Sequence, residues 1–410
     1  MKLLSVAGAR PNFMKLAAIA WAVDNFNNTI SPDNCAIQHV IVHTGQHYDK
    51  KMSQTFFDDL AIPKPDINLE VGSGSHAVQT AEIMKKFEPV LLAEQPDVLL
   101  VVGDVNSTIA CSLVAAKIEY PANSNRRRPL IVHVEAGLRS FDPDMPEEIN
   151  RILTDSISDL LFVTEESGIN NLRHSGVPDE KIHMVGNVMI DTLQRHLKKA
   201  RLSDIREQLA LPERYGIVTL HRPSNVDTQE TLEPLLSAIH TISQDIPLIF
   251  PIHPRTLKHI ELFGLTSLVN WSTYPDDELQ HDHSSAGSNS GVFIMPPLGY
   301  LDFLSLVEKA SLVITDSGGI QEETTYLQIP CMTLRHNTER PITVTIGSNY
   351  LLGTSPEKIL ETASSILKGS AKTGSIPDKW DGMAGTRVVD IIYHEYLAQK
   401  NNNSIEQVRV

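Results

Sequence analysis

The chain alternates short apolar runs with amphipathic stretches along its whole length, and this alternation limits the fold more than any other feature. The runs are rich in β-branched residues and are apolar throughout. Strands of this kind are typical of parallel sheets covered by helices on both faces. The predicted strands are residues 3–7, 40–43, 98–102, 130–134, 160–163, 216–220, 248–251, 292–295, 312–315 and 331–334, with helices including 14–24, 77–93 and 320–327. The pattern predicts an α/β protein.

The length favours more than one domain. A domain usually holds roughly 100–200 residues, and this chain has 410. The charged helical segment 191–212 is the best boundary, although it also fits an ordinary surface helix. We predict domains at 1–190 and 191–384, and a helix at about 385–410 can pack back on the first domain. Residues 123–129 and 276–291 are predicted surface insertions.

The charge balance excludes some classes of partner. Lys and Arg number 35 and Asp and Glu number 50, which gives a net charge of −15. Such an acidic chain is not expected to bind nucleic acid or an anionic membrane, although a local positive pocket for a phosphate ligand stays open. No apolar stretch reaches the ~18 residues of a membrane span, and no signal-peptide pattern opens the chain. We expect a soluble cytoplasmic protein.

We expect no metal site and no disulfide. The cysteines Cys35, Cys111 and Cys331 lack paired spacing, and the last two are expected to be buried thiols. His281, Asp282 and His283 lie in a stretch rich in Ser, Gly and Asn, which favours a solvated loop over a metal site.

Reactive side chains follow the predicted strands at their carboxyl ends, where open parallel sheets bind ligands. They are Arg10, Lys15, Asp104, Glu135, His221, His253 and Asp316. We predict one site in a cleft between the two halves.

Two groups in the first half suggest chemistry. Arg10 and Lys15 flank the start of a helix, where both can reach one ligand or can simply be solvated. Asp104, Glu135 and Glu147 are candidate acid and base groups, because neighbouring carboxylates push their pKa values apart. Asp104 and Glu147 also fit helix-start residues, whereas Glu135 between Val and Ala has less structural reason to be there.

Two glycine-rich segments differ in what they suggest. Ser317, Gly318 and Gly319 open a helix and can bind a phosphate at its N-terminus, or form a plain tight turn. Glu322 or Glu323 in the first turn can accept hydrogen bonds from a ribose. Residues 72–77 match a loose dinucleotide fingerprint, but the run before them is short and interrupted by prolines, so we interpret them as a Gly/Ser loop.

Taken together, these residues resemble the non-hydrolysing UDP-N-acetylglucosamine 2-epimerases, over nearly the whole chain. The order and spacing of the motifs make the resemblance specific. The motifs are Gly8-x-Arg10-Pro11-x-x-x-Lys15, Thr44-Gly45-Gln46-His47, Gly103-Asp104, His133-Val134-Glu135-Ala136-Gly137-Leu138-Arg139, Pro146-Glu147-Glu148-x-Asn150-Arg151, His221-Arg222, Asp316-Ser317-Gly318-Gly319-Ile320-Gln321-Glu322-Glu323 and Thr338-Glu339-Arg340-Pro341.

The resemblance implies two Rossmann-like domains of the GT-B type and inversion at C2 of a UDP-N-acetylhexosamine. Anti elimination of UDP gives a 2-acetamidoglucal, and UDP adds back as C2 is reprotonated on the opposite face. The resemblance implies no cofactor. It implies a homodimer and a role in polysaccharide biosynthesis.

The resemblance also assigns residue roles. It makes Asp104, Glu135 and Glu147 the acid and base candidates. It makes His221 and Arg10 the residues that hold the diphosphate, and Lys15 and Arg151 members of a shell of charged residues around the active site. The remaining substrate-binding positions are Ser317, Gly318 and Gly319 for phosphate, Glu323 for ribose, and Arg340 and His253 with less defined roles.

Departures from the family pattern leave the exact sugar open. Position 12 is Asn where many members carry Glu, and Pro223 follows His221-Arg222 where a second Arg is common. After His47 the spacing differs from members activated by their own substrate, so such activation is doubtful. These features resemble more closely a subgroup of the family that includes 2-epimerases of UDP-diacetamido uronic acids. Alternatives are a GT-B glycosyltransferase, a hydrolysing epimerase and a UDP-sugar sensor.

Overall fold

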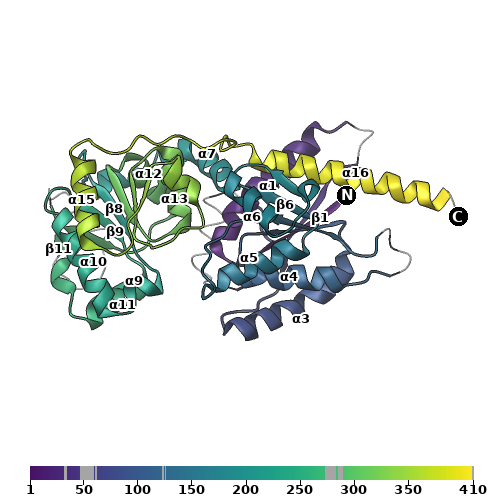
Figure 1. The fold of residues 1–410 in the computed structure, drawn as a ribbon, viewed down its shortest axis with the longest axis horizontal. Coiled ribbons are helices and arrows are strands. Elements are labelled where there is room, and N and C mark those ends of the chain that lie inside the picture. The colour runs from purple at the N-terminus through teal and green to yellow at the C-terminus, as the bar shows by residue number, and fades with distance from the viewer. Residues whose placement is uncertain are drawn as a thin grey trace. The chain divides into compact units, whose positions relative to one another are not determined.

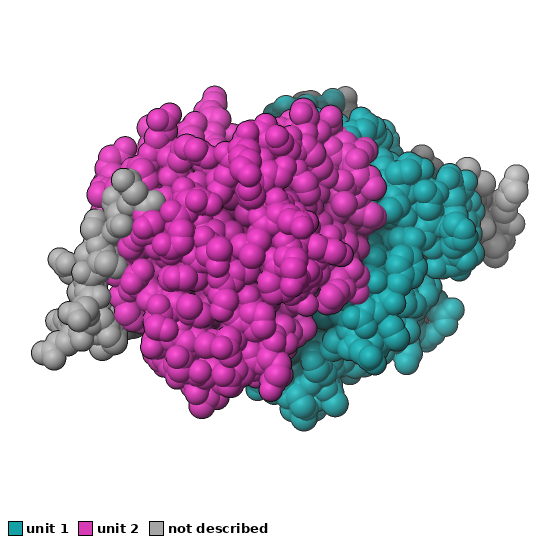
Figure 2. Space-filling view, turned by 60° about the vertical axis from the view of Figure 1, so that its left-hand side comes forward, with its two compact units in different colours: residues 1–192, 378–410 teal, residues 193–377 magenta. Residues whose placement is uncertain are grey.

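The computed structural model describes residues 1–31, 35–46, 60, 62–121, 124, 126–272, 283–284 and 290–408, without the side chains of Arg10, 283–284 and 401–408. His47, residues 123 and 125, most of residues 276–291 including His281 and Asp282, and the side chain of His283 lie outside this part. The chain divides into unit 1, Met1–Thr192 with Asp378–Val410, and unit 2, Leu193–Pro377 (Figures 1 and 2).

Unit 1 is built on a sheet whose seven described strands are all parallel, in the order β3-β2-β1-β4-β5-β6-β7. Its central strands are buried along their whole length, which is why they are apolar without alternation. The strands are β1 (Lys2–Ala7), β2 (Gln38–His43), β3 (Ile67–Asn68), β4 (Val98–Val102), β5 (Leu130–Val134), β6 (Leu160–Val163) and β7 (Ile182–Met184).

Helices on both faces cover this sheet, and the last helix of the chain packs along the first one (Figure 1). Gly385 allows that contact, because a Cβ there would lie 2.7 Å from the carbonyl oxygen of Ala18. The helices are α1 (Arg10–Thr29), α3 (His76–Glu94), α4 (Asn106–Lys117), α5 (Pro146–Ile157), α6 (Glu166–His174), the 3-10 turn Asp179–Lys181 and α16 (Ala384–Val408). Helix α7 (Val188–Ala200) leads from unit 1 into unit 2.

Unit 2 repeats the plan with eight described parallel strands in the order β11-β10-β12-β9-β8-β13-β14-β15. The strands are β8 (Gly216–Thr219), β9 (Leu248–Pro251), β10 (Asn270–Ser272), β11 (His283–Ser284), β12 (Val292–Met295), β13 (Leu312–Thr315), β14 (Cys331–Thr333) and β15 (Asn349–Leu351). The helices are α8 (Ile205–Gln208), α9 (Pro223–Val226), α10 (Gln229–Ile242), α11 (Pro254–Leu262), the 3-10 turn Thr266–Leu268, α12 (Tyr300–Lys309), α13 (Gly318–Leu327), α14 (Pro341–Thr345) and α15 (Pro356–Leu367).

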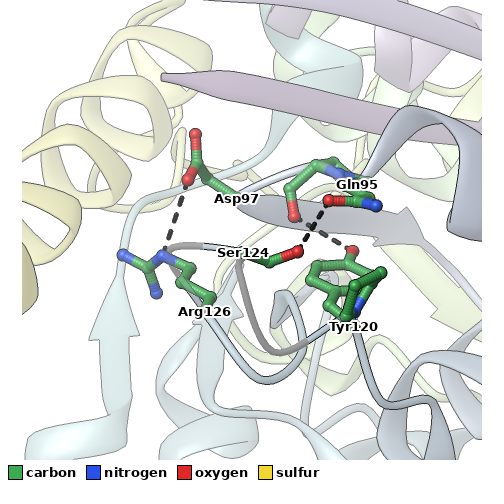
Figure 3. A pocket seen from close by; sticks show the side chains of 7 residues that line it. Gln95, Asp97, Tyr120, Ser124 and Arg126 are labelled. Atoms are coloured by element: carbon green, nitrogen blue, oxygen red, sulfur yellow. Dashed lines mark hydrogen bonds and ion pairs between the residues drawn. The ribbon is translucent and has the colours of Figure 1, made fainter.

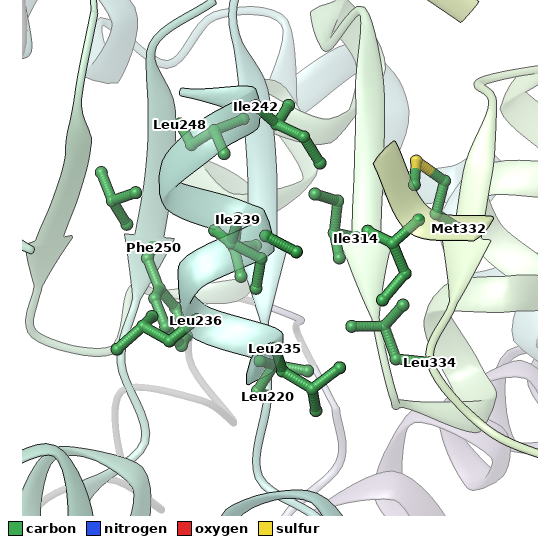
Figure 4. Packing of buried hydrophobic residues seen from close by; sticks show 14 of the residues in the cluster. Leu220, Leu235, Leu236, Ile239, Ile242, Leu248, Phe250, Ile314, Met332 and Leu334 are labelled. Atoms are coloured by element: carbon green, nitrogen blue, oxygen red, sulfur yellow. The ribbon is translucent and has the colours of Figure 1, made fainter. Parts of the chain in front are cut away.

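Helix α10 shows how unit 2 forms its core. Leu235, Leu236 and Ile239 are fully buried and pack with Phe250 and Ile314 from the sheet (Figure 4). Burying such side chains stabilises a fold by about 1.5–3 kcal/mol each. The i, i+1, i+4 spacing of the three helix residues therefore fixes which face of α10 meets the sheet.

The α/β prediction is confirmed, and every predicted strand has a counterpart. The sequence-based prediction missed the short strands β3, β7, β10, β11 and β15. These have two or three residues each, too few for a period to appear. Cys111 and Cys331 are buried free thiols, as expected. In the described part of the chain, no helix is long and apolar enough to cross a membrane.

Candidate active site

The candidate residues of unit 1 gather where three neighbouring strands end. β1, β4 and β5 lie side by side in the sheet. Their carboxyl ends lead into Gly8, Gly103-Asp104 and Glu135. Glu135 adopts a positive φ of 72°, which is uncommon for a residue with a side chain and often marks a functional position.

Lys15 and Glu135 form an ion pair at this edge. Lys15 Nζ contacts Glu135 Oε2, and the two residues are 7% and 3% exposed. Gly103 passes close to both, because a Cβ there would lie 3.1 Å from Lys15 Nζ and 3.3 Å from Glu135 Oε2. Its φ of +67° favours glycine as well. Lys15, predicted to belong to the charged shell, thus contacts a candidate acid or base.

Arg151 connects two carboxylates. Its Nη1 lies 2.5 Å from Asp104 Oδ2, and its Nη2 lies 2.7 Å from Glu148 Oε2. Burial raises the pKa of Glu148, but hydrogen bonds from the Ser140 and Phe141 backbone N–H groups and from Arg151 outweigh it, so the pKa lies below its ordinary value. Glu148 is therefore a buried anion that holds Arg151.

The neighbouring Glu147 has a different environment. It is half-buried in the first turn of α5, where a negative charge suits the helix dipole. Among the described residues, no hydrogen bond or ion pair reaches its carboxylate. In this part of the chain Glu147 thus differs from Asp104 and Glu135, which both have a cationic partner.

Asn12 occupies the place where many family members carry Glu, and it is 2% exposed. Its Nδ2 donates to the Val102 carbonyl at 3.0 Å, and its Oδ1 accepts from the Ala9 N–H at 2.9 Å. Asn12 therefore joins the ends of β1 and β4 without adding a charge.

In unit 2, Asp316 orders the segment that carries His221. The Asp316 carboxylate lies 2.9 Å from His221 Nδ1 and accepts backbone N–H groups of His221 and Arg222. Burial raises the pKa of Asp316, but the contacts with His221 and Arg222 outweigh burial, so the pKa lies below its ordinary value and the carboxylate is ionised. Asn225 Nδ2, two residues after Pro223, donates to Asp316 Oδ2 at 3.2 Å.

His253 lies beside His221, with ring centroids 5.9 Å apart. Its Nδ1 accepts the Arg255 N–H and so caps helix α11. Burial lowers the pKa of His253, and His221 and Arg255 lower it further. A neutral His253 has its remaining ring nitrogen, Nε2, as a donor.

The N-terminus of α13 has the form expected of an anion site. Ser317 is the N-cap residue but makes no side-chain cap bond, and Gly318 and Gly319 form the first turn. A Cβ at Gly319 would meet nothing within 4 Å, whereas one at Gly318 would lie 2.8 Å from Arg340 Nη1. The helix start thus has free space beside Gly319 for a ligand and a guanidinium group beside Gly318, and both favour an anion.

Arg340, predicted to bind substrate, lies in a buried charge cluster. It is 8% exposed, and it contacts Glu322 and Glu339 at 2.7 Å each. Burial raises the pKa of Glu339, but Arg340 and Arg335 outweigh it and leave the pKa far below its ordinary value. Arg340 therefore supports the Gly318 turn from behind.

Glu323 is also buried. Burial raises its pKa, a hydrogen bond from Tyr300 Oη at 3.1 Å lowers it, and Glu322 raises it again, to about 7. It can accept a hydrogen bond from a hydroxyl-bearing ligand in its ionised form.

In the described part of the chain, the structure thus brings predicted residues together in one group in unit 1 and in two groups in unit 2. Lys15, Asp104, Glu135 and Arg151 lie together in unit 1, and His221 and His253 lie together in unit 2, as do Ser317, Gly318, Gly319 and Arg340. The Arg10 side chain lies outside the described part. Glu148, Asp155 and His133 also hold this part of the site, and sequence reasoning assigned them no role. The sequence signal was a histidine that interrupts an apolar run at His133.

A polar pocket of about 360 Å³ lies at the other edge of the unit 1 sheet, before β4. Its polar groups bind one another: Tyr120 Oη donates to the Pro96 carbonyl, and Ser124 Oγ donates to Gln95 Oε1 (Figure 3). Arg126 pairs with Asp97 at 3.6 Å. The polar groups named here are thus paired with one another, and we interpret this pocket as a structural feature of the fold. Among the described residues, no group of three or more His, Cys, Asp or Glu could hold a metal ion.

Known nucleotide-sugar epimerases are similar to this chain over most of its length. The family model described as UDP-N-acetylglucosamine 2-epimerase matches residues 30–393. The UDP-N-acetylglucosamine 2-epimerase of Methanocaldococcus jannaschii is 40% identical over 403 residues, 97% of this chain and 100% of that protein. The UDP-2,3-diacetamido-2,3-dideoxy-D-glucuronate 2-epimerase of Pseudomonas aeruginosa is 37% identical with the same coverage.

A solved structure agrees. The crystal structure of the Methanocaldococcus jannaschii UDP-GlcNAc 2-epimerase in complex with UDP-GlcNAc and UDP has a TM-score of 0.79 and 39% identity. It covers 96% of this chain and 100% of its own. The predicted fold of two Rossmann-like parts is confirmed. The chain belongs to the UDP-N-acetylglucosamine 2-epimerase family.

Proposed function

We propose that this protein is a non-hydrolysing epimerase that interconverts UDP-N-acetylglucosamine and UDP-N-acetylmannosamine. The observation that carries the proposal is the edge of the unit 1 sheet, where Lys15-Glu135 and Arg151-Asp104 place two carboxylates and two cations together. The names of relatives at 40% and 37% identity support the same reaction class.

In the proposed reaction, the C2 proton leaves as the bond between C1 and the UDP oxygen breaks. The electron pair of the C–H bond becomes the C1–C2 double bond of a 2-acetamidoglucal. UDP then adds back at C1 while C2 takes a proton on its other face. The sugar undergoes no net oxidation or reduction, so proton transfer and stabilisation of the leaving diphosphate account for the chemistry.

The carboxylates of unit 1 are proposed to move the protons. Glu135, with its buried cationic partner, and Asp104, held by Arg151, are the first candidates, and Glu147 is the third. Lys15 compensates the charge on Glu135, so that the carboxylate can be buried at all.

The residues of unit 2 are proposed to hold UDP. His221 and the N–H groups of the Ser317-Gly318-Gly319 turn suit phosphate oxygens, and Glu323 suits the ribose hydroxyls. His253 and the Arg10 side chain are proposed to complete the diphosphate site. That both groups act on one substrate between two domains, and that the enzyme is a homodimer, stay predictions.

The test is deuterium exchange. The protein is incubated with UDP-N-acetylglucosamine in D₂O, and NMR follows the C2 position. Deuterium at C2, with UDP-N-acetylmannosamine formed, is the expected result. Release of free N-acetylmannosamine and UDP would indicate a hydrolysing enzyme, and no exchange with any UDP-N-acetylhexosamine would exclude the proposal.

The Pseudomonas aeruginosa relative gives reason for a second substrate. At 37% identity across the chain, a UDP-2,3-diacetamido uronate stays a candidate. The same exchange experiment with that sugar ranks the two by kcat/KM. Labelled sugar transferred to an acceptor without free epimer would instead indicate a glycosyltransferase.

A further inference from the structure

His133 is a fully buried histidine inside an otherwise apolar strand. It lies in β5 between Val132 and Val134, and it is 0% exposed. Both of its ring nitrogens have partners. Nε2 lies 2.8 Å from the Gly103 carbonyl oxygen, and Nδ1 lies 2.7 Å from Asp155 Oδ1.

The hydrogen positions follow from the partners. A carbonyl oxygen can only accept, so Nε2 donates to Gly103. The contact between Nδ1 and the Asp155 oxygen then holds one proton between them. The two contacts fix the orientation of the His133 ring and the position of the Asp155 carboxylate.

Asp155 extends the contact to the loop after β5. Its Oδ2 accepts the Gly137 N–H at 3.1 Å, and it lies 2.7 Å from Arg139 Nη1. Asp155 is 3% exposed. The charged and titratable groups in this cluster are thus His133, Asp155 and Arg139.

Each partner belongs to a segment that carries a proposed reacting group. Gly103 directly precedes Asp104, and Gly137 follows Glu135 by two residues. Asp155 lies on helix α5, one turn after Arg151, which pairs with Asp104. The His133-Asp155 pair therefore connects the segments that carry Asp104, Glu135 and Arg151.

Stability alone does not require such a pair. Replacing a buried charged pair by well-packed apolar side chains is often neutral or stabilising. The neighbouring positions of β5 are apolar and fit the same sheet. A histidine and an aspartate here give a fixed geometry, which an apolar pair cannot give.

We infer that His133 and Asp155 are positioning residues for the epimerisation, setting the distance between the Gly103-Asp104 turn and Glu135. The inference rests on the proposed function of those carboxylates. Reacting groups displaced by about 1 Å lose about 10²-fold in rate. Binding of UDP, which is assigned to unit 2, should not depend on the pair.

The test compares two substitutions of His133. His133→Phe keeps a ring but removes both hydrogen bonds, and we expect kcat to fall about 10²-fold. KM and the affinity for UDP should stay within about threefold, because neither depends on the spacing of the carboxylates. His133→Gln can still donate to the Gly103 carbonyl, and its kcat should exceed that of His133→Phe by about tenfold.

His39→Phe is the matched control. His39 lies near the amino end of β2 in the same sheet, away from the carboxyl ends where the proposed site lies, and its Nε2 contacts Ser5 Oγ at 2.8 Å. It should lower the melting temperature while leaving kcat within about twofold. If His133→Phe does not fold, Asp155→Asn carries the test. We expect a folded protein with a lower melting temperature, because the ion pair with Arg139 is lost, and a kcat reduced about tenfold.

The possible outcomes distinguish a failure of the proposed function from a failure of the positioning role. Absence of C2 exchange in the unsubstituted protein would reject the proposed function. If the unsubstituted protein shows exchange, three results would each overturn the positioning role alone. They are an unchanged kcat in His133→Phe, a kcat of His133→Gln no higher than that of His133→Phe, and an unchanged kcat in Asp155→Asn.

Discussion

Arg151 on helix α5 forms an ion pair with Asp104, 47 residues earlier at the end of β4, at 2.5 Å. The same guanidinium contacts Glu148. Since Arg151 is 1% exposed, one buried cation compensates two carboxylates. Asp104, a proposed reacting group, is therefore held by the same cation as the buried Glu148.

Arg151→Met should leave these two carboxylates without their cation. Breaking a buried pair from one side costs about 3–5 kcal/mol, so the urea midpoint of unfolding should fall clearly. Lys85→Met removes an exposed pair with Glu82 and serves as the control, with no change in midpoint expected. Equal midpoints for both variants would contradict the assignment.

Glu135→Gln should abolish deuterium exchange at C2. The amide keeps the shape of the carboxylate but cannot take a proton, and such groups supply about 10²–10⁴-fold in rate. The affinity for UDP, measured by calorimetry, should be unchanged. Retained exchange would remove Glu135 from the mechanism.

Gly103→Ala should lose activity well beyond its loss of stability. The new methyl group would lie 3.1 Å from Lys15 Nζ and 3.3 Å from Glu135 Oε2. Gly72→Ala is a matched control, because Gly72 has a similar φ of +77° and nothing within 4 Å of a Cβ. Both variants should lose about 1 kcal/mol of stability from backbone strain, and only Gly103→Ala should lower kcat. Equal activity in the two variants would refute this.

Glu323 should make stability depend on pH. Burial first, and Glu322 after it, raise its pKa from the ordinary 4.5 to about 7, despite the Tyr300 hydrogen bond. A raised carboxyl pKa means that the folded state prefers the proton, so stability falls as pH rises from about 4.5 to 7. Glu323→Gln lacks this loss.

The measurement is the melting temperature of both proteins without ligand. The variant should gain on the unsubstituted protein between pH 5 and pH 8. A difference that stays constant across this range would show that Glu323 does not titrate there.

The sequence alone indicated the α/β class, because buried parallel strands need continuous apolar runs, and that requirement is local. It also placed Asp104, Glu135 and His221 at strand ends, since strand ends can be located from the same runs. The short strands such as β7 and β15 were beyond this reasoning, because three residues carry no period.

Tertiary structure decided which of these side chains meet. Lys15 and Glu135 are 120 residues apart, and they touch only because β1 and β5 both flank β4 in the sheet. Glu148 rather than Glu147 turns inward to hold Arg151, and His133 finds Asp155 on a later helix. Such contacts depend on strand order and helix packing, which no local spacing of residues specifies.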